Sequence, residues 1–178
     1  MRVLLETTRL ILREFESTDS EIIRKLDSDP EVMKYISNGI PSDDTEVQRA
    51  IRVTIETLQK HQGAFGYWMA IEKSSNEIIG WFHLRPLKSD PDNTSIQELG
   101  YRLFRKFWNQ GFATEGSLAL IKYAKTKNVQ EVWAHSMSAN TSSQNVMKKC
   151  GLEFSCHDTY PEFPGEDKQT SWFKLKLT

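Results

Sequence analysis

The order of secondary-structure signals along the chain is the feature that most constrains its fold. Helical spacing or capping signals fall between the first two strand-like segments, after the fourth and after the fifth. The segments with strand-like composition or alternation are 8–14, 67–72, 77–84, 96–104, 131–137, 154–159 and 171–177. This order predicts a mixed α/β domain with a central, largely antiparallel sheet. We find no internal repeat and no linker, and therefore expect a single domain over residues 1–178.

Composition narrows the class of protein. A chain of 178 residues that is 38% hydrophobic and 26% charged has enough apolar surface to form a core, which excludes a disordered or collagen-like chain. A net charge of −1 argues against a dedicated nucleic-acid-binding protein. No apolar stretch approaches the roughly 18 residues that cross a bilayer, so we expect neither nucleic acid nor membrane as a partner. Cys150 and Cys156 are too few for a disulfide framework, and we expect free thiols and a cytoplasmic protein.

The segment 99–116, LGYRLFRKFWNQGFATEG, carries the strongest functional signal. A strand ends near its start, a short basic and aromatic loop follows, and a helix begins near Ala113. The first N–H groups of a helix have no intrahelical partner and carry partial positive charge. A glycine just before them lets the backbone approach a ligand closely. The segment therefore suggests a diphosphate site made by Gln110, Gly111, Phe112, Ala113 and Thr114. An ordinary strand-to-helix turn explains the local sequence equally well.

Charge is distributed unevenly along the chain. Residues 99–149 contain eight basic and two acidic residues, whereas the rest contains fifteen basic and twenty-two acidic residues. A phosphate-rich ligand would favour the first region and a cationic amine the second.

The same segment resembles the GNAT superfamily of acyl-CoA-dependent N-acetyltransferases, whose Gln/Arg-x-x-Gly-x-Gly/Ala motif holds the coenzyme A pyrophosphate. In the stretch 108–113 the two small positions match, at Gly111 and Ala113, whereas Trp108 replaces the leading Gln or Arg. That departure and the following Gly-Phe-Ala-Thr-Glu resemble the RimJ/RimL branch, which acetylates protein N-termini. Residues 140–152 and the opening stretch 6–13 also resemble this branch, so the likeness covers nearly the whole chain.

The resemblance implies a seven-stranded mixed sheet, flanked by helices and splayed between its fourth and fifth strands. Acetyl-CoA, the co-substrate, would enter this cleft, with its pantetheine paired to the free backbone of Leu103 and Phe104. Residues 110–114 would hold the diphosphate, and Asn140 would reach the pantetheine amides from the far side. Asn140 is also a good helix N-cap, and the two roles are compatible.

Acetyl transfer to an amine needs a neutral amine and a stabilised or protonated thiolate. An α-amine, with a pKa of about 7.7–8.0, is partly neutral at physiological pH, whereas a lysine at about 10.4 is not. A weak base is therefore enough. Glu98 is our candidate base, and a surface carboxylate paired with Arg102 is the alternative.

The resemblance also implies a tyrosine that acts as the acid seven residues after Asn140. Met147 occupies that position and cannot donate a proton. Ser143 matches the branch pattern, and we predict it as proton donor or hydrogen-bond partner of the thiolate. A second capping hydroxyl is the alternative interpretation of Ser143.

The remaining polar residues give weaker signals. The four histidines do not cluster in the sequence, and we interpret His83 and His135 as structural. Their spacing supports no metal site, so we expect no metal. The loop 160–167 has three carboxylates that would suit a cationic amine, although a solvated hairpin tip explains them as well.

Together these observations predict an N-acetyltransferase that transfers acetyl from acetyl-CoA to a primary amine by direct attack in a ternary complex. A protein N-terminal α-amine is the expected acceptor. The alternatives are a small amine, such as a polyamine or an aminoglycoside, and a non-catalytic acyl-CoA-binding domain. A monomer and a homodimer are both compatible with the sequence.

Overall fold

The computed structural model describes residues 2–177 and contains one eight-stranded sheet, in the order β1-β2-β3-β4-β5-β6-β8-β7. Every neighbouring pair is antiparallel except β5 and β6. The strands are β1 (Val3–Glu6), β2 (Leu10–Glu14), β3 (Gly66–Glu72), β4 (Glu77–Pro86), β5 (Ile96–Leu103), β6 (Glu131–Met137), β7 (Glu153–Thr159) and β8 (Gln169–Lys176). The expected mixed, mostly antiparallel fold is confirmed.

The expected number of seven strands is wrong by one. The additional strand, β1, is four residues long and pairs with β2 at the edge of the sheet. Its sequence Val-Leu-Leu-Glu is too short to show alternation, so it gives no periodic signal. The strands expected as fourth and fifth are therefore β5 and β6.

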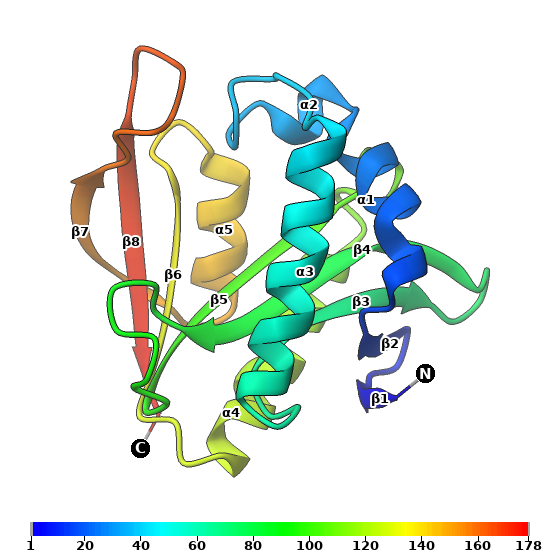
Figure 1. Cartoon of the computed structure of the whole chain (residues 1–178). Helices are drawn as coiled ribbons and strands as arrows, with labels where there is room; N and C mark the ends of the chain where they lie inside the picture. Colours follow the sequence, from blue (N-terminus) through cyan, green and yellow to red (C-terminus); the bar gives the residue numbers. More distant parts are fainter. Residues whose placement is uncertain (1, 178) are drawn as a thin grey trace.

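Helices cover both faces of the sheet (Figure 1). The α-helices are α1 (Ser20–Asp27), α2 (Pro30–Met33), α3 (Asp44–Lys60), α4 (Phe112–Thr126) and α5 (Thr141–Lys149), and the short 3-10 helices are η1 (Ser17–Asp19) and η2 (Arg105–Phe107). One face packs Met69 of β3 against Phe15, Ile23 of α1 and Val47 and Ile51 of α3. The larger core lies on the other face, where α4 and α5 pack against β4, β5 and β6.

β5 and β6 part in the middle of the sheet. Their pairing consists of Ile96 with Glu131, Gln97 with Val132 and Glu98 with Trp133. Beyond this point β5 stays on β4 as far as Leu103, and β6 stays on β8 as far as Met137. Figure 1 shows the two strands diverging toward the end of the molecule that carries α2, with α5 visible between them. The expected splay is confirmed, and below we call the space between these strand ends the β5–β6 gap.

Two further expectations can be checked on the described residues. Between residues 2 and 177, no helix is long and apolar enough to cross a membrane. Cys150 is a buried free thiol and Cys156 an exposed one, as expected. Burial raises the pKa of Cys150 to about 11, although a hydrogen bond with Ser117 opposes the shift.

Candidate active site

The start of α4 has the geometry of an anion site. Gly111 is the N-cap, with φ 82° and ψ 0°, a left-handed conformation that side chains with a Cβ disfavour. The N–H of Glu115 donates to the Gly111 carbonyl at 3.0 Å, so the N–H groups of Phe112, Ala113 and Thr114 precede the first intrahelical bond. Gly111 makes no side-chain cap. These backbone groups are therefore available to a phosphate.

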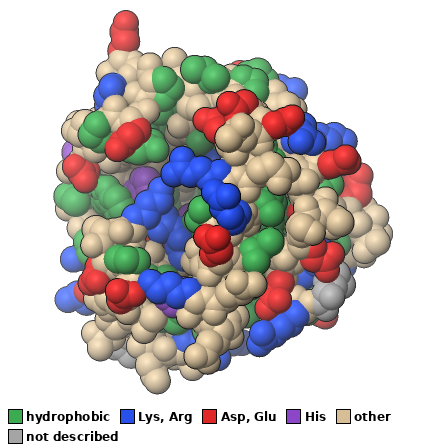
Figure 2. Space-filling model, in the orientation of Figure 1, with side chains coloured by type: hydrophobic (Ala, Val, Ile, Leu, Met, Phe, Trp, Pro, Cys, Tyr) green, Lys and Arg blue, Asp and Glu red, His purple; other side chains and the backbone are tan. Residues whose placement is uncertain are grey.

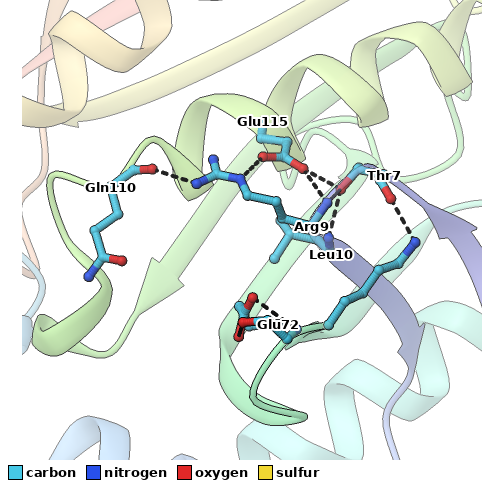
Figure 3. A network of polar contacts seen from close by, with 8 residues as sticks. Thr7, Arg9, Leu10, Glu72, Gln110 and Glu115 are labelled. Carbon is cyan, nitrogen blue, oxygen red and sulfur yellow. Dashed lines mark hydrogen bonds and ion pairs between the residues drawn. The ribbon is translucent and has the colours of Figure 1, made fainter.

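Arg9 ties this turn to the start of β2 (Figure 3). Its Nε lies 2.6 Å from Glu115 Oε2, and its Nη1 donates to the Gln110 carbonyl at 2.9 Å. Thr7 donates to Glu115 Oε1 at 2.6 Å, and the Arg9 guanidinium lies 4.3 Å from the Phe112 ring centroid. Burial would raise the pKa of Glu115, but the bonds from Thr7 and Arg9 outweigh it and lower that pKa. The loop is thus fixed on both sides of Gly111.

Arg9 is a candidate site residue that the sequence analysis missed. It lies in the opening stretch 6–13, which carried part of the family resemblance but had no role. Its guanidinium nitrogen Nη2 would lie 3.4 Å from a Cβ built on Gly111. A positive charge therefore stands directly beside the free amides of α4, where sequence spacing alone could not place it.

The edge of β5 differs from the expectation in one respect. Phe104 was expected to offer free backbone, but its N–H donates to the Ile79 carbonyl and its carbonyl accepts from the Phe107 N–H, both at 2.9 Å. That expectation is wrong because the chain turns into η2 immediately after β5. In a trans peptide the Leu103 carbonyl points away from the Phe104 N–H, and hence away from β4. It accepts a bond from Trp108 Nε1 at 2.8 Å.

Glu98 is the last residue of β5 that pairs with β6, and it is 5% exposed. Arg85 stands opposite it on β4, and Arg85 Nη2 donates to Glu98 Oε1 at 2.9 Å. The alternative of a surface carboxylate paired with Arg102 is wrong, since Arg102 pairs with Asp27 of α1. Glu98 instead lies at the point where the β5–β6 gap opens.

Two histidines reach the same carboxylate oxygen. His83 Nε2 on β4 and His135 Nε2 on β6 each lie 3.5 Å from Glu98 Oε1. His83 faces Gly100 in the β4–β5 register, and a Cβ at Gly100 would lie 2.6 Å from His83 Cε1. The glycine therefore makes room for the ring. The spacing of these residues in the sequence does not indicate the cluster, because it combines His83 and Arg85 of β4 with Glu98 of β5 and His135 of β6.

The protonation of the cluster follows from burial and charge. Burial would raise the pKa of Glu98, but hydrogen bonds from His135 and His83 and the nearby Arg85 charge hold it well below 4.5. Burial lowers the pKa of His83, with the bond to Glu98 opposing the shift. At neutral pH the cluster contains a carboxylate, an arginine cation and a neutral His83.

His135 is the more accessible histidine of the pair. Its side chain is 34% exposed, compared with 11% for His83. Its ring stacks on Trp172 of β8, with the centroids 4.3 Å apart and the planes at 22°. Figure 2 shows the α3 face of the molecule, where Lys and Arg side chains gather near the middle and His side chains are visible beside them.

A cavity of about 200 Å³ lies between α1, α3 and the sheet. Tyr67 and Trp81 line it, and their ring centroids lie 5.1 and 5.9 Å from that of His83. The paired Asp27 and Arg102 line it as well. Two residues that line the cavity therefore contact His83, whose Nε2 lies 3.5 Å from Glu98 Oε1.

On the other face of the sheet, α5 begins beside the gap. Asn140 is its N-cap, and Asn140 Oδ1 accepts the Ser143 N–H at 3.1 Å, so the capping role is confirmed. Burial raises the pKa of Tyr101 on β5, and a side-chain hydrogen bond with Ser143 opposes the shift. The start of α5 therefore contacts β5 through Ser143 and Tyr101, while Met147 is buried in the core. Tyr101 is the second candidate site residue that the sequence analysis missed.

The acidic loop between β7 and β8 is solvated. Glu162, Glu166 and Asp167 are all exposed, and Asp167 accepts the Gln169 N–H at 3.0 Å. Figure 1 shows this loop at the same end of the sheet as α2. Within the described part of the chain, no three His, Cys, Asp or Glu side chains are arranged to hold a metal ion.

Comparison with known proteins agrees with this geometry. Residues 9–153 match the family model of the acetyltransferase (GNAT) domain. The chain belongs to the GNAT acetyltransferase family. It is an acetyl-CoA-dependent N-acetyltransferase, as the sequence predicted.

Two curated relatives and one solved structure illustrate the relationship. This GNAT protein is 33% identical over 168 residues to the FsC-acetyl coenzyme A-N(2)-transacetylase of Aspergillus fumigatus, covering 88% of this chain and 70% of the relative. It is 32% identical to the N-acetyltransferase p20 of Bacillus licheniformis, covering 84% and 82%. RimL, a ribosomal L7/L12 α-N-protein acetyltransferase solved with coenzyme A, matches with a TM-score of 0.81 at 14% identity, covering 99% and 98%. The last comparison shows the shared fold.

Proposed function

We propose that residues 1–178 act as one domain that transfers acetyl from acetyl-CoA to the α-amine of a protein N-terminus, by direct attack in a ternary complex. The β5–β6 gap is the observation that carries this proposal. The anion-binding start of α4 and the pair Ser143 and Tyr101 border it from one face of the sheet. Glu98 and His135 border it from the other.

The residues around the gap fit acetyl-CoA. The α4 amides and the Arg9 cation beside them suit a diphosphate. We propose that residues 110–114 hold it, and that the edge of β5 at Leu103 and the Asn140 side chain contact the pantetheine. For Leu103 to pair with an amide, its carbonyl must exchange the Trp108 bond for one from the pantetheine.

Charge pairing supports an α-amine over a polyamine. Asp27, which lines the cavity, and Glu98, where the β5–β6 gap opens, are buried carboxylates that are each paired with an arginine. A polyamine would need unpaired carboxylates for its additional cations, because burying an unpaired charge is costly. A peptide N-terminus brings one amine, which is partly neutral at physiological pH. The side chain of the first residue of the peptide suits the cavity lined by Tyr67 and Trp81.

We propose catalytic roles for Glu98 and Ser143. Ser143 donates a hydrogen bond or proton to the departing thiolate, in place of the tyrosine that Met147 replaces. Glu98 acts in proton removal from the amine. Its low pKa makes the carboxylate itself a weak proton acceptor, which favours a role through a neighbouring group.

The test is a measurement of free-thiol release from acetyl-CoA with a panel of acceptors. We expect turnover with short peptides that have a free N-terminus, and none with the same peptides blocked by N-terminal acetylation. Spermidine and an aminoglycoside represent the small-amine alternatives. Preference for either over every peptide contradicts the acceptor assignment. Calorimetric binding of acetyl-CoA without turnover on any amine supports the non-catalytic domain, and no binding overturns both.

A further inference from the structure

Three cationic or hydrogen-bonding groups converge on one oxygen of Glu98. Arg85 Nη2 donates to Oε1 at 2.9 Å, and the Nε2 atoms of His83 and His135 lie 3.5 Å from the same atom. Glu98 is buried and forms an ion pair with Arg85. A carboxylate in this setting holds its neighbours in place better than it accepts a proton.

The two histidines differ in access to the gap. His83 is enclosed by the rings of Tyr67 and Trp81 and by the backbone of Gly100. His135 lies on β6 two residues beyond Trp133, where the pairing between β5 and β6 has ended, and its side chain is 34% exposed. A bound acceptor can therefore reach the His135 imidazole directly, whereas the His83 ring is covered.

The surroundings of His135 suit a group that becomes positively charged. Glu98 faces His135 from β5, and Arg85 and His83 of β4 both contact the Glu98 carboxylate. On β8, Trp172 stacks on its ring, and Lys174 lies 5.1 Å from the neighbouring Trp133 ring. Glu98 contacts His135, and its negative charge favours the positively charged imidazolium.

We propose that His135 Nδ1, the ring nitrogen not held by Glu98, accepts the proton released by the attacking amine, and that Glu98 is the positioning residue that accepts the Nε2–H bond of this imidazole and stabilises its protonated form. The assignment rests on the proposed function and identifies the proton acceptor of that site. Imidazole is suited to the role because it ordinarily titrates between pH 5 and 8.

Acetyl transfer forms one carbon–nitrogen bond and breaks one carbon–sulfur bond. The amine lone pair forms a bond to the acetyl carbonyl carbon, and the carbon–sulfur bond breaks with its electron pair leaving on sulfur. The nitrogen loses one proton to His135 Nδ1, and the thiolate takes up one proton from the Ser143 hydroxyl, which water reprotonates, or from water directly. The products are the N-acetylated amine and the free thiol. His135 then returns its proton to solvent through its exposed edge.

The test compares His135→Gln with His61→Gln, which changes a histidine at the end of α3, outside this cluster. We measure kcat/KM against pH with the best peptide acceptor, and take the ratio of wild type to variant at each pH so that acceptor ionisation cancels. General-base catalysis is worth about 10²-fold or more. We expect a ratio of that order at alkaline pH, falling toward one as acid protonates the imidazole. The His61 variant should give a ratio near one throughout.

Two further measurements separate proton transfer from structure. Calorimetry should give the same acetyl-CoA dissociation constant for wild type and His135→Gln. Added imidazole should restore part of the activity of His135→Ala, because the exposed position admits a small base. In a folded Glu98→Gln variant, kcat should fall while the acetyl-CoA dissociation constant stays unchanged, since the imidazole loses the carboxylate that positions it.

The outcomes are distinguishable. A pH-independent ratio for His135→Gln, or no imidazole rescue in folded His135→Ala, overturns the assignment of His135 while leaving an active acetyltransferase. Absence of wild-type turnover with every amine instead overturns the proposed function.

Discussion

Arg85 and Glu98 face each other across β4 and β5, and their 2.9 Å contact is buried on both sides. Arg85 also donates from Nη1 to the Pro86 carbonyl at 3.0 Å, so its position is fixed by two acceptors. Through Glu98 the pair also orients His83 and His135. One ion pair therefore links the core of the sheet to the gap where β5 and β6 part.

Removing the charge of Glu98 should destabilise the fold. Breaking a buried ion pair from one side typically costs about 3–5 kcal/mol. We expect Glu98→Gln to lower the free energy of unfolding at neutral pH by that amount, as measured by urea denaturation. Glu77→Gln is the matched control, because Glu77 pairs with Lys106 at an exposed site and should cost about 0–1 kcal/mol.

The Glu98 effect should also depend on pH. The folded-state pKa of Glu98 lies well below its ordinary 4.5, so the native carboxylate contributes stability above 4.5. That contribution is lost as the pH falls from 4.5 through the folded pKa. The stability difference between wild type and Glu98→Gln should therefore shrink over this acidic range. A stability difference that stays constant below pH 4.5 would show that the paired carboxylate does not become protonated in this range.

Gly111 and Gly151 form a matched pair for testing the diphosphate site. Both have positive φ, 82° and 85°, and both are exposed. Alanine at either position should cost about 1–2 kcal/mol in backbone strain. Only Gly111→Ala should also raise the acetyl-CoA dissociation constant, because Gly111 sets the direction of the α4 amides. Bulkier Gly111→Val should raise it further by obstructing the backbone. Equal affinities for Gly111→Ala and Gly151→Ala would contradict the site.

Local sequence signals predicted the α4 turn and the N-cap of α5 well. The glycine before a helix and the stretch 108–113 identify the α4 turn, because helix N-termini depend on a few adjacent residues. The Asn140 cap could be predicted for the same reason. The parting of β5 and β6, in contrast, came from the family resemblance, since nothing in the periodicity of either strand shows where pairing ends.

The polar cluster could not be predicted from spacing. His83, Glu98 and His135 come from three strands, and their meeting depends on register and on Gly100 leaving room for a ring. The alternative interpretation of Glu98 paired it with Arg102, because both lie on one face of β5. That interpretation was wrong because a cross-strand neighbour, Arg85 here, is closer than a residue four positions away on the same strand.

Arg9 should contribute to acetyl-CoA binding through geometry and charge. We expect Arg9→Gln to raise the dissociation constant several-fold, since it removes the bond to Gln110 and the cation beside Gly111. Arg24→Gln is the control, because Arg24 is equally exposed, at 43% against 41%, and forms a 2.6 Å pair with Asp44. Calorimetry should show no change for the control. An unchanged affinity in Arg9→Gln would limit Arg9 to a structural role.

Tyr101 and Ser143 should act together on the departing thiolate. Burial raises the pKa of Tyr101, so its hydroxyl stays protonated across the neutral range and can support Ser143 as a donor. We expect Tyr101→Phe and Ser143→Ala each to lower kcat by on the order of tenfold. The kcat of the double variant should be no lower than that of the less active single variant, because the two hydroxyls act as one unit. Tyr123→Phe is the control, since Tyr123 is also raised in pKa by burial but donates to the Ala64 carbonyl. Additive losses in the double variant would show that the hydroxyls act independently.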